Sequence, residues 1–463
     1  MIRLFNRYWA LPAVVSLTAE GLLLLAAVPL AIQLRLGVGP GTLPPGSTVL
    51  NDALTFMIIG LLCLYANGLY DFGERLSSRE LLIRLLRAFS VLAVASWALY
   101  FMVPDVQTGR GVFALALVFG MSLVLAWRVV LRWLLRSEGF AERVMIVGSD
   151  KKAIDIAREI LSRKHLGYRV VGFLDDDPAL QGVSLINPRV IGTTAQACEL
   201  AVQHGVTRVV VAAMDYRGHL SMDALLECKT NGIRVQEGYS YYEQLTGKIM
   251  VEGLRKSWLI FSDGFVVSRG TLFAKRLLDI LVATVGLVVA LPFMLLVALA
   301  VRLDSPGPVF FRQERVGRGG REFTLWKFRS MRTDAEAAGA RWAVEGDPRV
   351  TRVGRFIRKT RLDELPQLWN VLVGDMSLVG PRPERRMFVE QLKEQCPWYE
   401  QRLVVRPGLT GWAQVKAPYA STFEESIEKL KFDLYYIKNL SLFLDISILL
   451  STARIVLLGR GAR

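Results

Sequence analysis

Long apolar runs constrain the fold of this chain more than any other feature of its sequence. Four of them lie within the first 135 residues, at roughly 11–34, 49–70, 81–103 and 111–131. Each approaches the ~20 residues that a helix needs to cross the hydrocarbon core of a bilayer. The first run follows two arginines, as in a signal peptide, but its length and the three later runs favour a retained helix. The sequence therefore predicts a four-helix transmembrane domain over residues 1–138.

The basic residues around these runs predict how the helices are oriented. Arginines lie before the first run, between the second and third, and after the fourth. The loop over 36–48 has no charged residue, and the loop over 105–110 is nearly neutral. Because Lys and Arg accumulate in cytoplasmic loops, we expect both ends of the bundle in the cytoplasm.

Short β-rich segments alternate with helical stretches over residues 139–270. The segments RVMIVG, YRVVGFLDDD, RVVVAA and IRVQEG predict a parallel, doubly wound, Rossmann-like α/β domain. A dinucleotide site is weakly supported, because Gly148-Ser149-Asp150 replaces the glycine-rich turn that a pyrophosphate requires. Residues 175–177 are all Asp, where a ribose-binding acid could lie, although a solvated acidic turn explains them equally well. We therefore expect a regulatory or oligomerisation domain.

A fifth apolar run covers residues 277–301 and contains Pro292 near its middle. Basic residues flank it on both sides, which is unfavourable for a simple crossing, and Pro292 removes a helical hydrogen bond. These features predict a broken, re-entrant membrane helix that returns to the cytoplasmic side. The alternative is a fifth crossing with a proline kink.

The overall charge limits the class of partner without selecting one. Fifty-seven Lys and Arg residues against 42 Asp and Glu give a formal net charge of +15, which suits an anionic membrane surface, an anionic substrate or nucleic acid. Residues 304–331 interleave arginines with aromatics, and we favour lipid phosphates over single-stranded nucleic acid as their partners. The four cysteines lack C-x-x-C spacing and there are three histidines, so neither disulfides nor structural zinc is expected.

An adjacent acidic pair, Asp363 and Glu364, lies at the centre of the most distinctive stretch, RFIRKTRLDELPQLWNVLVGDMSLVGPRPE, which covers residues 355–384. Carboxylates among cations suit phosphate chemistry, since one can attack phosphorus while the other holds a divalent cation. Asp363 could instead cap the helix that residues 365–373 predict, with Pro366 in its first turn.

Seven segments in order carry a family resemblance: AKRLLDI, the apolar run containing Pro292, SPGPVFFRQERVG, KFRSM, DPRVTRVGRFIRKT, LDELPQLWNVLVGDMSLVGPRP and RPGLTGWAQV. With them, the chain from Phe273 onward resembles the polyisoprenyl-phosphate hexose-1-phosphate transferases, bacterial membrane enzymes that start exopolysaccharide, capsule or O-antigen repeat units. The four spans and the α/β domain look like the large form of the family. The resemblance implies that residues 271–463 form an α/β monotopic phosphoglycosyl transferase domain with a re-entrant membrane helix.

The resemblance also implies roles for individual residues. Asp363 matches the nucleophile that would attack the β-phosphorus of a UDP-sugar and release UMP, and Glu364 matches the acid that binds Mg²⁺. A polyprenyl phosphate would then accept the phosphosugar. Pro292 matches the helix-breaking proline, although Leu291 replaces a serine of some relatives. The implied phosphate-binding residues are Arg358 and Arg382, and less firmly Lys327 and Arg329.

We expect UDP-sugar, undecaprenyl phosphate and the bilayer as partners, a homodimer as the assembly, no nucleic acid, and the bacterial inner membrane as the location. The catalytic domain would face the cytoplasm, with the helical stretch over 423–463 at the membrane interface. No motif identifies the sugar. Two other hypotheses are a non-catalytic scaffold for polysaccharide export, which leaves the acidic pair unexplained, and a nicotinamide-dependent sugar epimerase or dehydratase, which the missing glycines disfavour.

Overall fold

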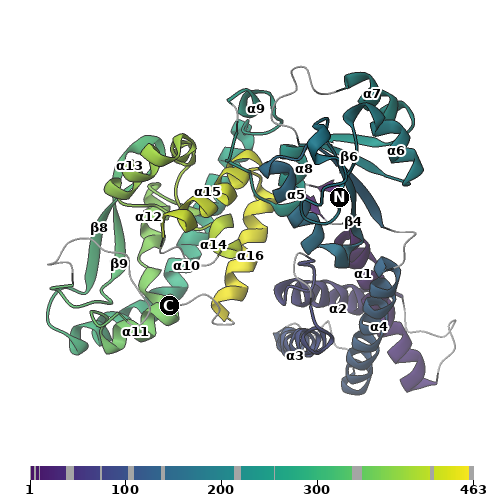
Figure 1. The fold of residues 1–463 in the computed structure, drawn as a ribbon. Coiled ribbons are helices and arrows are strands. Elements are labelled where there is room, and N and C mark those ends of the chain that lie inside the picture. The colour runs from purple at the N-terminus through teal and green to yellow at the C-terminus, as the bar shows by residue number, and fades with distance from the viewer. Residues whose placement is uncertain are drawn as a thin grey trace. The chain divides into compact units, whose positions relative to one another are not determined.

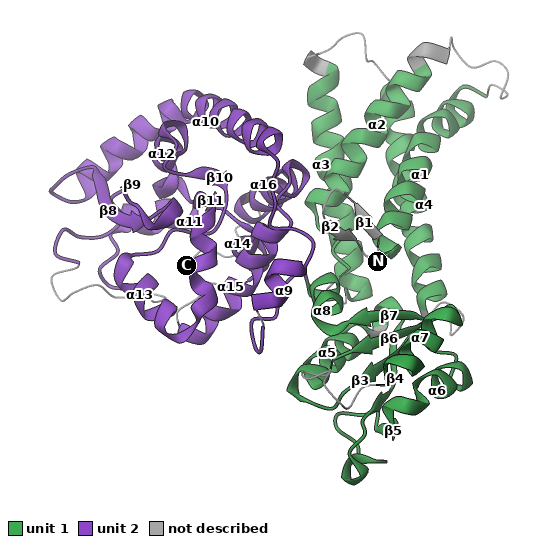
Figure 2. Cartoon of the chain, turned by 90° about the horizontal axis from the view of Figure 1, so that it is seen from above, with its two compact units in different colours: residues 1–3, 8–246 green, residues 4–7, 247–463 purple. Residues whose placement is uncertain are grey.

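The chain separates into two compact units, which Figure 2 shows in different colours. A computed structural model describes residues 2–4, 7–9, 11–37, 46–72, 76–102, 109–136, 141–212, 221–254, 256–335, 347–417 and 422–457. Unit 1 consists of residues 1–3 and 8–246, and unit 2 of residues 4–7 and 247–463. Strands β1 (Ile2–Leu4) and β2 (Arg7–Trp9) pair with each other at the N-terminus.

Four apolar helices open unit 1, and they confirm the four predicted runs. They are α1 (Leu11–Leu36), α2 (Gly46–Ala66), α3 (Ser78–Met102) and α4 (Arg110–Arg136). Each contains a stretch long and apolar enough to cross a membrane. Their shared core includes Leu24, Phe56 and Leu92. The bundle also contains a buried ion pair that the sequence did not reveal, in which Arg128 Nε lies 2.5 Å from Glu20 Oε1.

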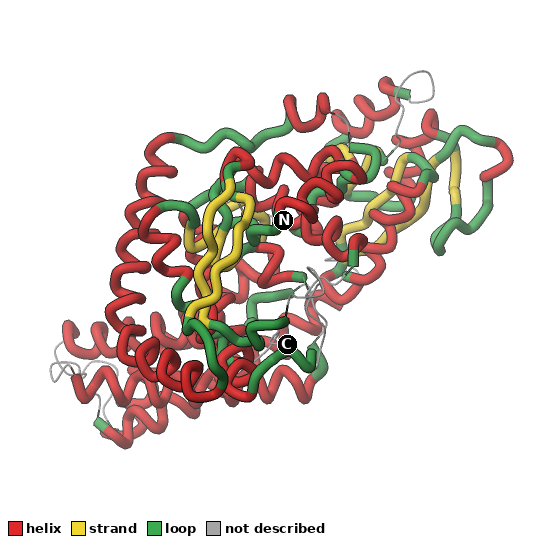
Figure 3. Tube along the Cα trace, turned by 90° about the vertical axis from the view of Figure 1, so that its left-hand side faces the viewer, coloured by secondary structure: helices red, strands yellow, loops and turns green. Residues whose placement is uncertain are grey.

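A five-stranded parallel sheet with the order β5-β4-β3-β6-β7 follows the bundle, as the alternating pattern predicts. Figure 2 labels its strands, Figure 1 shows β4 and β6 beside the helices that surround them, and Figure 3 draws strands in yellow. The strands are β3 (Glu142–Val147), β4 (Tyr168–Leu174), β5 (Val190–Gly192), β6 (Arg208–Val211) and β7 (Arg234–Glu237). The helices are α5 (Lys151–Ser162), α6 (Ala197–Gln203), α7 (Met222–Thr230) and α8 (Gly238–Thr246). Helices α6 and α7 pack on the sheet face that carries Met145 and Val209. We did not predict the short strand β5.

The acids at the carboxyl edge of this sheet bind neighbouring protein groups. Asp175 accepts a hydrogen bond from Ser149, and Asp176 accepts one from the backbone N–H of Thr194. Asp177 caps the short 3-10 helix that follows it. These contacts favour the interpretation of residues 175–177 as a structured acidic turn.

Unit 2 contains a two-stranded antiparallel sheet, a two-stranded parallel sheet and several helices. The strands are β8 (Phe310–Val316), β9 (Glu322–Phe328), β10 (Ser377–Val379) and β11 (Gly408–Thr410). The helices are α9 (Lys256–Phe261), α10 (Arg269–Asp304), α11 (Arg352–Lys359), α12 (Gln367–Val373), α13 (Arg386–Gln395), α14 (Trp412–Lys416), α15 (Phe423–Lys438) and α16 (Leu442–Leu457). The short 3-10 segments η6 (Leu362–Glu364) and η7 (Pro397–Val404) complete the part that carries the predicted site.

Helix α10 is the fifth helix that is long and apolar enough to cross a membrane. It runs as one continuous helix through Pro292, and the membrane break predicted at this proline stays a prediction. A single proline removes one backbone hydrogen bond, which a 36-residue helix can tolerate with a local bend. Whether α10 re-enters or crosses the bilayer stays a prediction.

The polar residues at the start of α10 anchor it to the rest of unit 2. Lys275 Nζ lies 2.7 Å from Asp445 Oδ2 on α16 and donates to the carbonyl of Val379. Arg276 donates to two carbonyls at the end of α12, and Asp279 accepts from the backbone N–H of Leu378 at 3.0 Å. The segment AKRLLDI therefore docks α10 against β10, α12 and α16. The ion pair with Lys275 also explains why Asp445 lies within the apolar run of α16.

Residues 247–270 pack with unit 2, although the sequence placed them with the α/β domain. Ile249 N donates to the carbonyl of Lys431, and Phe265 N donates to that of Lys438, both on α15. Lys248 also forms an ion pair with Glu428. The contacts of this segment therefore begin unit 2 at Gly247 rather than at residue 271.

Candidate active site

A pocket of about 660 Å³ in unit 2 brings together most of the predicted site residues. Asp363, Glu364, Arg358, Arg382 and Lys327 all line it. Eleven Lys and Arg side chains but four carboxylates line its walls among the described residues. The pocket is therefore strongly positive, as a site for an anionic substrate requires.

The acidic pair lies in a tight turn between two helices. Arg361 follows α11 with a left-handed backbone (φ 60°), and the 3-10 segment η6 then leads into α12. Pro366 occupies the N-cap position of α12, so the interpretation of Asp363 as that helix's cap is wrong. Leu362 packs with Ile357, Phe328 and the second half of α10, which fixes the turn.

Asp363 is buried, with 7% of its surface exposed. Its Oδ1 atom has no hydrogen-bond partner in the described part of the chain. Leaving a buried carboxylate oxygen unpaired is costly, so such an atom points to a ligand or a reactive role. Neither capping nor packing explains this unpaired oxygen of Asp363.

Glu364 is held by cations from separate parts of unit 2. Lys327 Nζ on β9 lies 3.0 Å from Glu364 Oε1, and Arg382 Nη2 in the loop after β10 lies 2.9 Å from the same atom. Arg361 Nη1 is 4.0 Å away. Side chains from chain positions 327, 361 and 382 thus converge on one oxygen of Glu364.

The surroundings raise the pKa of Asp363 and lower the pKa of Glu364. Burial, and then the neighbouring Glu364 charge, raise the pKa of Asp363 to about 6. Burial alone would also raise the pKa of Glu364, but the charges of Lys327 and Arg382 hold it well below its usual range. Asp363 is therefore the more basic of the two carboxylates, and its Oδ1 atom has no hydrogen-bond partner among the described residues. Glu364 stays ionised and is held in place by its cations.

The remaining predicted cations differ in what they contact. The Arg358 guanidinium makes no ion pair with the described residues, and it lies near enough to lower the pKa of Asp363. Arg329 is 5% exposed and donates to the carbonyls of Ser305 and Pro306, just after α10. These contacts favour a structural role for Arg329, in which it holds the end of α10 against β9.

Arg402, Asp433 and Lys429 also line the pocket, and the sequence analysis missed them. Arg402 Nη2 lies 2.9 Å from Asp433 Oδ2 and donates to the carbonyl of Arg382 at 2.9 Å. Arg402 also donates to the Tyr399 hydroxyl. Lys429 and Asp433 lie on α15, where the spacing of apolar and polar residues is that of an ordinary amphipathic helix. The only signal available was their i, i+4 spacing, which is also that of a surface ion pair.

The loop that carries Arg382 depends on a close approach of two backbones. A Cβ atom at Gly380 would meet the carbonyl of Arg406 and come within 2.9 Å of Gly408 N. Gly380 N donates to the carbonyl of Thr410, and Gly408 N to that of Pro381. The glycine of the GPRP segment is therefore required for the loop to reach Glu364.

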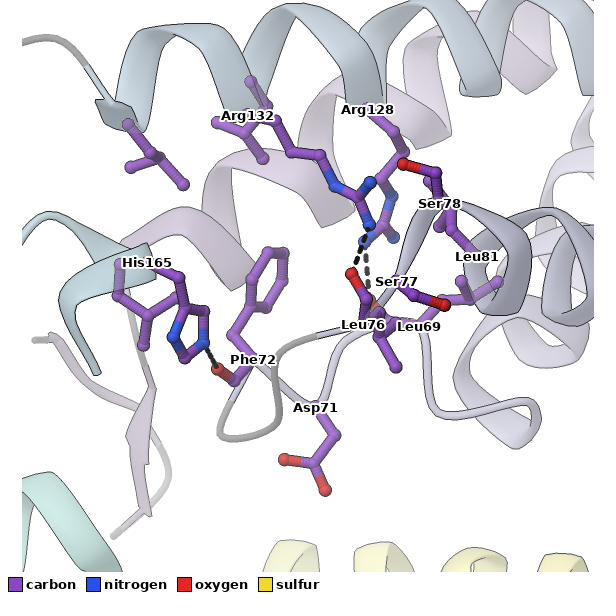
Figure 4. A pocket seen from close by; sticks show the side chains of 13 residues that line it. Leu69, Asp71, Phe72, Leu76, Ser77, Ser78, Leu81, Arg128, Arg132 and His165 are labelled. Carbon is purple, nitrogen blue, oxygen red and sulfur yellow. Dashed lines mark hydrogen bonds between the residues drawn. The ribbon is translucent and has the colours of Figure 1, made fainter. Parts of the chain in front are cut away.

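A second cavity, of about 630 Å³, lies in unit 1 and is lined by the segment after α2, the start of α3, the end of α4 and residues 165–166, which follow α5. Figure 4 shows Arg128 and Arg132 donating to the carbonyls of Leu69 and Leu76, and His165 bonded to the carbonyl of Phe72. These three polar side chains of the cavity therefore already make hydrogen bonds to backbone carbonyls of the protein. None of the predicted site residues lies here.

The fold and the positive pocket define a membrane protein with an enzyme site for an anionic substrate. Comparisons with known proteins agree. The sequence model described as "Bacterial sugar transferase" matches residues 270–459, and one described as "CoA-binding domain" matches residues 65–227.

Three relatives indicate the family. The UDP-glucose:undecaprenyl-phosphate glucose-1-phosphate transferase of Xanthomonas campestris pv. campestris is 32% identical over 89% of this chain and 88% of its own length. An enzyme of the same name from Escherichia coli (strain K12) is 46% identical over 70% of each chain. The UDP-N-acetylgalactosamine-undecaprenyl-phosphate N-acetylgalactosaminephosphotransferase of Aeromonas hydrophila is 47% identical over 52% of this chain and 56% of its own length. The protein belongs to the family of bacterial undecaprenyl-phosphate sugar phosphotransferases.

Proposed function

We propose that the protein transfers a hexose 1-phosphate from a UDP-sugar to undecaprenyl phosphate and releases UMP, through a covalent intermediate on Asp363. The observation that carries this proposal is the buried, unpartnered Oδ1 of Asp363 in a pocket lined by cations. The relatives' names supply the donor and acceptor classes. Exopolysaccharide repeat-unit assembly is the process that such a product would start.

In the first step the Asp363 carboxylate attacks the β-phosphorus of the UDP-sugar. A bond forms between the carboxylate oxygen and phosphorus, and the bond from phosphorus to the oxygen that bridges the two phosphates breaks. The electron pair leaves with UMP. Arg358 and Arg382 stabilise the charge that spreads over the phosphate oxygens. Glu364, fixed as an anion, keeps Lys327 and Arg382 in place.

In the second step a phosphate oxygen of undecaprenyl phosphate attacks the same phosphorus. The bond between Asp363 and phosphorus breaks, and the aspartate returns as a carboxylate. The pKa of about 6 suits this double role, because the carboxylate is ionised at neutral pH yet more basic than an exposed aspartate. A nucleophile in this way divides one difficult displacement into two easier ones.

The residues present fit a magnesium ion. Mg²⁺ in phosphate-transfer sites is commonly held by one or two carboxylates, with substrate phosphates and water completing its shell. Glu364 is the carboxylate that would hold the ion, and it lines the same pocket as Asp363. The ion would offset phosphate charge.

We propose that α10 holds unit 2 at the bilayer, where a lipid acceptor can reach the site. The apolar side chains of α10 are largely exposed, with Val288 at 68% and Leu295 at 65%, as expected for a helix that faces lipid. We place the protein in the bacterial inner membrane, with α10 re-entrant and the pocket on the cytoplasmic side, where UDP-sugars are made. A homodimer is the assembly that we propose.

A UMP-release assay tests the proposal with the full chain in detergent, Mg²⁺, undecaprenyl phosphate and a panel of UDP-hexoses and UDP-N-acetylhexosamines. One donor should release UMP and, before lipid is added, leave radiolabelled phosphosugar on the protein. Asp363→Asn should do neither, while Asp375→Asn, at an exposed aspartate outside the pocket, should behave as wild type. Wild-type protein that turns over no donor, or Asp363→Asn protein that turns over at the normal rate, would contradict the proposal.

A further inference from the structure

The α15 wall of the active-site pocket carries a lysine to which the proposed reaction assigns no role. Lys429 and Asp433 are four residues apart, so they project from the same face of α15, and both line the pocket. Lys429 is partly buried. A partly buried ammonium group needs an anion nearby, and Asp433 is the obvious candidate on its own helix.

The carboxylates of this wall are already bound to arginines. Asp433 Oδ2 accepts from Arg402 at 2.9 Å, and Glu384 Oε2 lies 3.2 Å from Arg315 Nη1. Each acid therefore has one full positive charge beside it before Lys429 is counted. The wall as a whole keeps an excess of positive charge.

Arg382 adds a second cation to the same region. Arg402 fixes its carbonyl, and its guanidinium reaches Glu364. Burial lowers the pKa of Lys429, and the positive charge of Arg382 lowers it further. Two cations that repel each other on a partly desolvated wall are stabilised when an anion binds between them.

We infer that Lys429 and Arg382 together bind the phosphate of the departing nucleoside monophosphate, so the wall formed by α13, η7 and α15 is the nucleotide side of the pocket. This inference rests on the proposed function and adds which wall receives the donor. As the bond from the β-phosphorus to the bridging oxygen breaks, negative charge grows on that oxygen. The two ammonium and guanidinium groups stabilise the charge without any proton transfer.

The other walls favour this assignment over the acceptor. Phe310, Phe311 and Phe328 line the pocket close to where the chain leaves α10, and Phe328 packs with Val297 and Val301 of that helix. An apolar polyprenyl chain fits these aromatics. A nucleotide fits the α15 wall, where Lys429 and Ser426 are polar.

The test compares UMP with the lipid acceptor as probes of the full chain in detergent. Lys429→Met removes the charge at similar length, Lys429→Arg keeps it, and Lys393→Met is the matched control. Lys393 is a half-buried lysine on α13 that lies outside the pocket and pairs with Glu400. For each protein we would measure product inhibition by UMP, KM for the UDP-sugar, KM for undecaprenyl phosphate and the thermal midpoint.

Lys429→Met should weaken UMP inhibition by about tenfold or more, since a hydrogen bond to a charged group is lost. The KM for the UDP-sugar should rise while that for undecaprenyl phosphate stays within about twofold, and Lys429→Arg should recover most of the loss. A variant that folds poorly would have a lower thermal midpoint and a changed KM for undecaprenyl phosphate as well. These two measurements therefore separate a structural role of Lys429 from a role in binding UMP.

Two results would overturn the inference while leaving the proposed function intact. Lys429→Met could turn over normally and bind UMP as wild type does, or it could raise only the KM for undecaprenyl phosphate, which would assign Lys429 to the acceptor. If wild-type protein neither binds UMP nor turns over any donor, the proposed function fails together with the inference.

Discussion

The buried ion pair between Arg402 and Asp433 should be a large and measurable source of stability in unit 2. The two side chains are 8% and 3% exposed and their closest atoms are 2.9 Å apart. Arg402→Met leaves the Asp433 carboxylate buried without its cation, which costs about 3–5 kcal/mol. It also removes the hydrogen bond to the carbonyl of Arg382. In a unit of this size, about 4 kcal/mol lowers the thermal midpoint by roughly 10 °C.

Thermal unfolding of the full chain in detergent, followed by tryptophan fluorescence, measures this change. The double variant Arg402→Met/Asp433→Leu should recover at least half of the lost midpoint, because an apolar pair replaces the buried charge. Lys393→Met is the control, since its ion pair with Glu400 is exposed and worth at most about 1 kcal/mol. Activity should fall with Arg402→Met too, because Arg382 loses its backbone support.

The pH dependence of the Arg402→Met variant provides a second measurement. Burial already raises the pKa of Asp433 against the opposing charge of Arg402. Without Arg402 the folded-state pKa rises further above the unfolded value. The folded protein then binds the extra proton, so the variant should lose stability as pH rises and recover it towards pH 5. A midpoint for Arg402→Met that equals wild type, or single-variant losses that simply add in the double variant, would refute the reasoning.

Three further predictions concern the reaction. Asp363→Asn should reduce UMP release by about a thousandfold or more with an unchanged thermal midpoint, and residual turnover near wild type would exclude Asp363 as nucleophile. Formation of the phosphosugar adduct should increase about tenfold per pH unit below about 6 and level off above 7, because the reactive form of Asp363 is the carboxylate, so a flat profile from pH 5 to 7 would disagree. Gly380→Ala should reduce activity at least tenfold because its Cβ would collide with the Arg406 carbonyl, whereas Gly270→Ala should be neutral, because its Cβ would meet the Ser268 hydroxyl at an ordinary contact distance of 3.8 Å.

Local patterns in the sequence were enough for several parts of this protein. Apolar runs of sufficient length specify membrane helices because each helix satisfies its own backbone in lipid. The alternation of β-rich and helical segments specifies the parallel sheet, since each connection needs a crossover. The adjacent acids at 363 and 364 were likewise visible as neighbours in the chain. In each case the deciding physics acts between residues that are close in sequence.

Only the tertiary structure decided what these residues contact. The sequence could not show that Lys327 and Arg382 meet at one oxygen of Glu364, or that Arg329 binds carbonyls after α10. Burial and the fields of distant charges set the pKa of Asp363, and they depend on how β9, α12 and the loop after β10 pack together. Likewise, only the packing shows that Glu20 pairs with Arg128 and that Asp445 pairs with Lys275. Ion pairs join residues far apart in the chain, so their identity is a property of the packing.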